Sequence, residues 1–257
     1  LWARVMGRGV AATSDDLGAL GVPPENLALL DHLAVRLRDH PSRRSLLRDI
    51  VLSRSYQMVS HHPDPRAPQV DASNAHWHRA HQKRLNAEAI RDSILSVSGR
   101  LDRKVGGTSV PVHLTDFLTG RGRPGGSGPV DGQGRRSLYI KVCRNFLPAF
   151  LTAFDFPIPS TTVGDRLVTN VPAQALALMN DPFVHDQARL WGERAMKSAE
   201  DEGLTVAIDT MWQQAFGRAP SGEEIAMARE FVEEKGVEGW ADLAHALIQT
   251  KEFRFIP

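Results

Sequence analysis

Residues 135–188 read RRSLYIKVCRNFLPAFLTAFDFPIPSTTVGDRLVTNVPAQALALMNDPFVHDQA, and this stretch decides the fold. Polar residues interrupt apolar ones most densely here, and a glycine-rich segment, residues 104–134, leads directly into it. Buried polar groups have to be paired with one another or with backbone groups. We therefore expect a network of mutually bonded side chains that holds the flanking helices together, with any ligand or reaction site on its edge.

The stretch itself is expected to contain short elements separated by proline. Alternating apolar residues with β-branched and aromatic side chains predict a short strand or extended segment at 138–142. A short helix is expected over 146–154, and a helix over 173–179 begins after a proline that suits its first turn. The Asp-Pro pair at 181–182 is typical of a helix N-cap followed by the first helical residue, so the next helix is expected to begin there.

Helical spacing of apolar residues covers most of the remaining chain. The segments that show it are 26–40, 42–56, 84–99, 183–199, 204–216, the residues from 221 onward, and 240–250. Gly217 marks the end of one of these helices, and Ser221 with Glu224 has the spacing of a capping box at the start of the next. The sequence therefore predicts a mainly α fold, a multi-helix domain that ends in an antiparallel helical bundle.

Three parts are expected along the chain. They are an N-terminal helical part (1–103), a glycine-rich loop (104–134), and the central stretch with the helical bundle (135–257). We expect them to form one continuous domain. The chain opens at Leu1 in the middle of a helix-like pattern, which we interpret as a fragment of a longer protein.

Composition excludes several classes of function. A net charge of +1 gives no overall field that would attract a nucleic acid. The single cysteine, Cys143, excludes a disulfide within the chain and a thiolate zinc site. The sequence has no run of about 18 apolar residues that would span a membrane, and it shows no signal-peptide pattern. No nucleic acid and no membrane span are therefore expected.

The glycine-rich segment holds nine glycines and cannot be a regular element, because glycine loses too much backbone entropy when it is fixed. It does not have the GxxxxGK[ST] pattern of a phosphate-binding loop. A flexible surface loop is expected, and a mobile lid over the central stretch is the alternative.

Five of the ten histidines lie between positions 61 and 81. Neutral imidazoles at short spacing can converge on a transition metal. Only His78 and His81 have helical spacing, and no carboxylate accompanies them outside the loop. No metal site is therefore expected, with His76, His78 and His81 as weak candidates.

The central stretch supplies the candidate site residues. They are Arg136, Tyr139, Arg144, Asp155, Arg166, Asn170, Gln174 and Asn180. A structural hydrogen-bond network explains them, and so does a ligand site whose arginines bind carboxylate or sulfate groups through paired hydrogen bonds. The catalytic residues are unknown. Arg84, Glu88 and Arg91 form a ladder of alternating charges, either solvated or partly buried against the central stretch.

Several long motifs resemble one family. They are GRGVAATSDDLGALG, RLNAEAIRDSILSVSGRLD, RRSLYIKVCRN, FDFP, VPAQALALMNDPFV, FGRAPSGEE and ALIQTKEF. Together they cover nearly the whole chain, which resembles the domain of unknown function 1553. That domain ends many planctomycete and verrucomicrobial surface proteins that carry a cytochrome c domain at their front. The resemblance implies an extracytoplasmic location and a haem c group in a domain outside this chain, with no cofactor in the chain itself.

Three functions remain open. The first is an accessory or ligand-binding module that contacts an anionic polysaccharide or other domains of the same protein. The second is a catalytic domain acting on sugars by a redox or hydrolytic step, with the glycine-rich segment as a lid and with Tyr139 and Asp155 converging in a pocket beneath it. The third is a structural domain that binds a protein partner. Whether the chain is an enzyme is left undecided.

Overall fold

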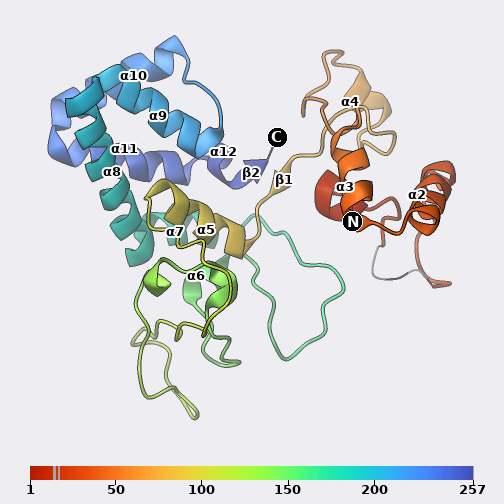
Figure 1. The fold of residues 1–257 in the computed structure, drawn as a ribbon, viewed down its shortest axis with the longest axis horizontal. Coiled ribbons are helices and arrows are strands. Elements are labelled where there is room, and N and C mark those ends of the chain that lie inside the picture. Colours follow the sequence, from red (N-terminus) through yellow and green to blue (C-terminus); the bar gives the residue numbers. More distant parts are fainter. Residues whose placement is uncertain (14–15, 17, 257) are drawn as a thin grey trace. The chain divides into compact units, whose positions relative to one another are not determined.

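The computed structural model describes residues 1–13, 16 and 18–256, which form two compact units (Figure 1). The first unit comprises Leu1–Arg84 together with Phe255 and Ile256, and the second comprises Leu85–Arg254. Both are built mainly from helices, so the expected fold class is confirmed. The units divide after residue 84, whereas the segments expected from the sequence divide after residues 103 and 134.

The first unit is a small set of helices with one pair of strands. Its elements are α1 (Trp2–Met6), α2 (Leu27–Asp39), α3 (Arg43–Val51), α4 (Ala67–Val70), β1 (Lys83–Arg84) and β2 (Phe255–Ile256). The two strands pair antiparallel, with Lys83 opposite Ile256. The side chains of Asn26 and Ser42 cap the N-termini of α2 and α3. The buried core is the cluster Met6, Leu46 and Ile50.

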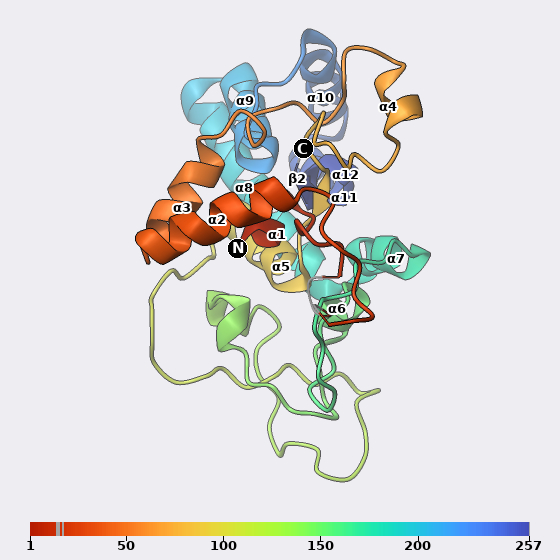
Figure 2. The same ribbon diagram turned by 90° about the vertical axis from the view of Figure 1, so that its right-hand side faces the viewer.

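The second unit carries the larger core and the whole central stretch. Its elements are α5 (Ala87–Val97), the short 3-10 helices η1 (Gly132–Gly134) and η2 (Ser137–Tyr139), α6 (Ala149–Ala153), α7 (Pro172–Asn180), α8 (Pro182–Glu202), α9 (Leu204–Phe216), α10 (Gly222–Lys235), α11 (Val237–Gln249) and α12 (Lys251–Arg254). Figures 1 and 2 show α5 between the helices α9–α11 on one side and the irregular segment 98–148 on the other.

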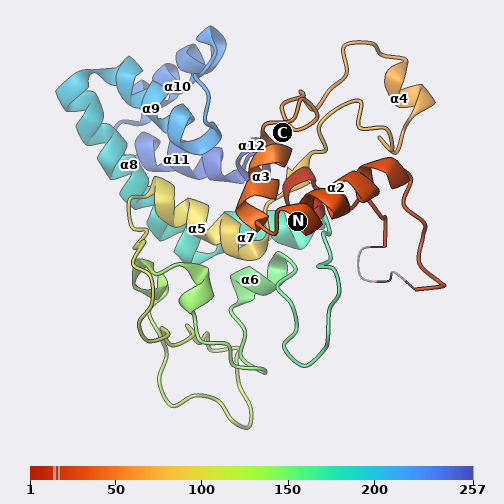
Figure 3. The same cartoon turned by 45° about the vertical axis from the view of Figure 1, so that its right-hand side comes forward.

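Helices α8 to α11 form the expected C-terminal bundle (Figure 3). Helix α8 packs against both α9 and α11, and α10 packs against α11. Gly192 allows α8 and α11 to approach closely, because a Cβ atom there would lie 2.5 Å from the backbone nitrogen of Ala241. Burial of Trp191, Ile208 and Ile248 fills the core of the bundle.

Helix ends in this unit follow the capping residues that the sequence predicts. The Asp181 carboxylate accepts a hydrogen bond from the backbone N–H of Phe183 at the start of α8. Gly217 ends α9 in the left-handed conformation, with a φ of 70°. Ser221 and Glu224 make both hydrogen bonds of a capping box at the start of α10. Local sequence therefore determines these boundaries.

The predicted strand at 138–142 is absent, and the alternative of an extended segment holds only for the residues after Tyr139. Ser137–Tyr139 forms the 3-10 helix η2, and the extended chain after it makes a single bridge between Ile140 and Val110. The bridge does not grow into a ladder, because Pro111 follows Val110 and has no N–H to donate.

The glycine-rich segment is irregular, and part of it is tightly packed. A Cβ atom at Gly128 would lie 1.9 Å from the carbonyl oxygen of Pro111, and one at Gly134 would lie 2.1 Å from that of Arg100. Gly134 also has a φ of 71°, a conformation that favours glycine. Gly126, in contrast, has open space at its Cβ position. Close backbone packing therefore requires glycine at some positions of this segment and not at others.

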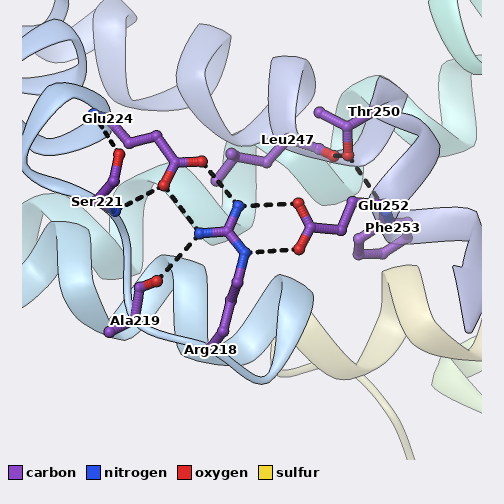
Figure 4. Close-up of polar contacts among 8 residues, drawn as sticks. All are labelled: Arg218, Ala219, Ser221, Glu224, Leu247, Thr250, Glu252 and Phe253. Atoms are coloured by element: carbon purple, nitrogen blue, oxygen red, sulfur yellow. Dashed lines mark hydrogen bonds and ion pairs between the residues drawn. The ribbon is translucent and has the colours of Figure 1, made fainter. Parts of the chain in front are cut away.

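Arg218, directly after α9, ties this helix end to α10 and α12 (Figure 4). Its guanidinium donates to both carboxylate oxygens of Glu252 at 2.6 and 2.9 Å, and to both of Glu224 at 2.8 Å. These hydrogen bonds hold the pKa of Glu224 well below its usual range and raise the pKa of Arg218. Paired, charge-assisted hydrogen bonds of this kind combine strength with a fixed geometry. The clamp therefore fixes the turn between α9 and α10.

We predict that Gly134→Ala lowers the free energy of unfolding by about 2 kcal/mol or more, because the methyl group meets the Arg100 backbone and the backbone conformation is strained. Gly126→Ala is the matched control and should change it by less than about 0.5 kcal/mol. Urea unfolding followed by tryptophan fluorescence measures both. Equal effects of the two substitutions would contradict the packing role of Gly134.

Removal of the clamp by Arg218→Met should lower the free energy of unfolding at pH 7 by about 1 kcal/mol, a modest value because the pairs are partly exposed. The folded-state pKa of Glu224 is depressed, so the stabilisation is present above the unfolded-state pKa of about 4.3. It is lost as the pH falls toward the folded-state value. Urea unfolding at pH 7 and pH 3 tests this.

The control for this substitution is Arg189→Met, which removes an exposed ion pair with Glu193 one helical turn away. Its effect should stay below about 0.5 kcal/mol at both pH values. An Arg218→Met loss of equal size at pH 3 and pH 7 would argue against an ionic clamp.

Candidate functional site

A buried arginine on α5 joins this helix to the irregular segment. Arg91 is only 4% exposed. Its Nη1 donates to the carbonyl oxygen of Arg135 and to the hydroxyl of Ser137, both at 3.1 Å, and its Nη2 donates to the carbonyl oxygen of Asp131 at 2.6 Å. Burial lowers the pKa of Arg91, and the nearby carboxylates of Asp92 and Asp131 offset part of this effect. The guanidinium therefore connects α5 to three residues of the segment 131–137.

Two carboxylates of α5 form ion pairs with arginines of the central stretch. Asp92 accepts hydrogen bonds from the backbone N–H and the hydroxyl of Ser137, both at 2.7 Å. It also pairs with Arg136, whose Nε lies 3.6 Å away. Glu88, one turn earlier, pairs with Arg166 at 2.7 Å. The central stretch is thus attached to α5 by both backbone contacts and ion pairs.

Arg135 holds the start of the glycine-rich segment. Its guanidinium donates to the carbonyl oxygens of Lys104 and Gly106 at 3.0 and 2.6 Å, and it pairs with Asp102 at 3.3 Å. It also lies over the ring of Tyr139, 4.0 Å from the ring centre. The Tyr139 hydroxyl accepts a hydrogen bond from the backbone N–H of Gly106. Arg135 and Tyr139 therefore fix the same backbone.

A second polar cluster lies between α6 and α7. The two carboxylate oxygens of Asp155 accept hydrogen bonds from the backbone N–H and the hydroxyl of Thr169, at 2.9 and 2.8 Å. Gln174 is 1% exposed and donates to the carbonyl and hydroxyl oxygens of Thr169 at 3.2 and 3.1 Å. This cluster closes the connection between residues 155 and 169.

The eight predicted site residues therefore fall into three groups. Arg136, Tyr139 and Arg166 belong to the network around α5. Asp155 and Gln174 meet at Thr169. The third group lies on the surface: Arg144, Asn170 and Asn180. The structure therefore does not show one hydrogen-bond network that joins Arg144 and Asp155 to the other arginines.

The residues that the prediction omitted are the centre of the network. Asp92 and Ser137 received no role, and Arg91 appeared only as part of a charge ladder. Arg91 is buried against the central stretch, which agrees with the alternative of a partly buried charge ladder. A usable signal was its place between Ile90 and Ile94, at the edge of the apolar face of α5.

Tyr139 and Asp155 do not converge on a common partner. The Tyr139 hydroxyl is bonded to Gly106, and both Asp155 oxygens are bonded to Thr169. The glycine-rich segment does border a pocket, but neither side chain is part of its lining. The catalytic site that the sequence suggested, with Tyr139 and Asp155 in one pocket beneath the glycine-rich segment, is therefore not formed.

Three histidines of the first unit, His62, His78 and His81, are engaged in packing. The rings of His62 and His78 lie edge to face with centres 5.4 Å apart, and His81 packs in the same way against Trp77 at 4.9 Å. Burial lowers the pKa of His81, with further lowering by nearby arginines. In the described part of the chain, no group of three or more histidine, cysteine or acidic side chains could hold a metal ion.

An open groove of about 760 Å³ runs along the exposed side of α5. Its charged lining consists of Glu88, Asp92, Arg103 and Arg136, two carboxylates and two guanidinium groups. Asn86, Ser93 and Ser96 add neutral polar groups, and Leu101 and Leu138 add apolar surface. The groove therefore offers hydrogen-bond donors and acceptors without an excess of either charge.

We expect Arg91→Met to lower the free energy of unfolding of the second unit by about 3 kcal/mol, because it removes three hydrogen bonds, two of them fully buried. Arg100→Met is the matched control. It removes an exposed pair with Asp131, a residue of the same network, and should cost less than about 1 kcal/mol. Hydrogen exchange of the amides of residues 131–140 and urea unfolding measure both. Equal losses of unfolding free energy in the two variants would show that Arg91 does not hold the segment 131–137 on α5.

Comparison with known proteins gives a family and no closer relative. No curated protein and no solved structure matches the chain significantly. Among the described residues, no helix has the length and apolar character needed to cross a membrane. The family described as "protein of unknown function (DUF1553)" matches residues 1–232, which include α5, the Arg91 network and the groove. The chain therefore belongs to the DUF1553 family.

Proposed function

We propose that the second unit is a saccharide-binding module and that the groove along α5 is its binding site. The observation that supports this proposal is the mixed lining of the groove, which combines carboxylates and guanidinium groups with hydroxyl and amide groups. Sugar hydroxyls both donate and accept hydrogen bonds, so they need both kinds of partner at fixed positions.

The two carboxylates of the groove are held in place by the fold. Asp92 is fixed by two hydrogen bonds from Ser137, and Glu88 is fixed by Arg166. Side chains that are already ordered lose little conformational entropy when a ligand binds. This preorganisation favours recognition of a polar ligand that offers little apolar surface.

Charge balance bears on the kind of saccharide. The two carboxylates of the groove offset its two guanidinium groups, so the groove offers no net positive field. A neutral saccharide suits this lining better than the anionic polysaccharide expected from the sequence. An anionic ligand would need Arg103 and Arg136 to act alone, and Arg136 is already 3.6 Å from Asp92.

A binding role fits the carboxylates better than hydrolysis. Glu88 and Asp92 are four residues apart on one helix, so they reach a ligand from the same side. Glycosidase carboxylates flank the scissile bond instead. From the family resemblance we further propose that the module works outside the cytoplasm, beside a haem c domain of a longer protein.

Titration calorimetry with a neutral agarose-derived hexasaccharide and a sulfated carrageenan hexasaccharide tests the proposal. The neutral hexasaccharide should bind, and Arg136→Gln should weaken its binding at least fivefold, because a donor of the groove is lost. Arg144→Gln is the control, since Arg144 is exposed and lies outside the groove.

Preferential binding of the sulfated hexasaccharide would support the anionic ligand instead. The proposal fails if neither saccharide binds at millimolar concentration, or if the two substitutions have the same effect.

A further inference from the structure

A second pocket of about 100 Å³ lies beneath the glycine-rich segment, bordered by that segment, α6 and the start of α8. Its lining is mainly apolar and includes Ile140, Phe150 and Phe183. Four polar side chains also line it, and they are Arg91, His113, Thr115 and Asp181. A mainly apolar pocket with a few convergent polar groups is the usual form of a small-molecule site.

Asp181 places a half-buried carboxyl group in the wall of the pocket. Its carboxylate caps α8 through the backbone N–H of Phe183, at 2.9 Å. Burial raises the pKa of Asp181, although this hydrogen bond and the nearby His113 and His185 lower it in part. Among the described residues, no lysine or arginine forms an ion pair with it. A half-buried carboxylate in this position gains from a ligand that brings a positive charge.

His113 adds a second acceptor to the pocket. Its Nδ1 lies 2.9 Å from the carbonyl oxygen of Gly128, which can only accept a hydrogen bond. This contact requires a proton on Nδ1, and in the neutral imidazole Nε2 then carries the lone pair. The side chain is half-buried, so Nε2 can accept a hydrogen bond from a ligand donor.

Arg91 does not supply the missing positive charge. Its N–H groups donate to the carbonyl oxygens of Asp131 and Arg135 and to Ser137, and the carboxylates of Asp92 and Asp131 offset its charge. The pocket therefore presents unmatched acceptors beside aromatic rings.

We propose that this pocket binds a small primary amine as its ammonium ion, with the nitrogen at Asp181 and His113 and an aliphatic body among the apolar residues. An apolar cavity of about 150 Å³ holds benzene, so about 100 Å³ suits a body of about four carbons. The site shares no side chain with the groove along α5, and it does not depend on the proposed saccharide binding.

Calorimetric or NMR titration with isobutylammonium chloride, isobutanol and sodium isobutyrate tests the charge preference, because the three probes have nearly the same shape. Isobutylammonium should bind at least tenfold more tightly than isobutanol, and isobutyrate should bind most weakly. The amide signals of Phe183 and Gly128 should shift on binding.

Asp181→Asn tests the role of the carboxylate without loss of the helix cap, because asparagine is an equally good N-cap residue. The variant should fold like the original protein and lose the preference for the ammonium over the alcohol. Asp186→Asn, on the exposed side of the same helix, should keep the tenfold preference.

Three results would overturn the proposal. Equal binding of ammonium and alcohol would show an apolar cavity without charge recognition. Absence of binding at 50 mM of each probe would show a packing space that takes no ligand. Retention of the preference in a folded Asp181→Asn protein would place the amine elsewhere.

Discussion

The second unit depends on one constraint: the buried guanidinium group of Arg91 has to find hydrogen-bond acceptors inside the fold. A charge inside a protein destabilises the fold unless it is paired and hydrogen-bonded. Arg91 meets this requirement with two backbone carbonyls and the Ser137 hydroxyl, all from the segment 131–137. That segment has little regular structure of its own. One buried charge on a regular helix therefore fixes an irregular chain in a single conformation.

Two surfaces with different chemistry result from this attachment. On the exposed side of α5, arginines from the central stretch meet the carboxylates Glu88 and Asp92, and the charges balance. Beneath the glycine-rich segment, the same attachment leaves Asp181 in a mainly apolar pocket without an ion-pair partner among the described residues. A balanced set of donors and acceptors suits a neutral polar ligand, whereas an unmatched carboxylate suits a cation. The two proposed ligands differ for this reason.

Family motifs in this chain have separable roles. The motif FGRAPSGEE supplies Arg218, Ser221 and Glu224, which build the clamp and the capping box at the start of α10. The motif VPAQALALMNDPFV instead supplies Asp181 at the edge of a pocket. One motif therefore builds a helix junction and the other lines a pocket, and the contacts of their side chains distinguish the two.

The sequence by itself determined the longer helices and several of their ends. Asp181, Gly217 and the Ser221–Glu224 pair act on backbone groups within a few residues, and the apolar spacing of α5 and α8–α11 is equally local. Only the tertiary structure decided the partners of the polar side chains. Arg166 pairs with a carboxylate 78 positions away, and Arg91 bonds to a hydroxyl 46 positions away. Such pairs depend on how distant segments pack, and no local pattern encodes that packing.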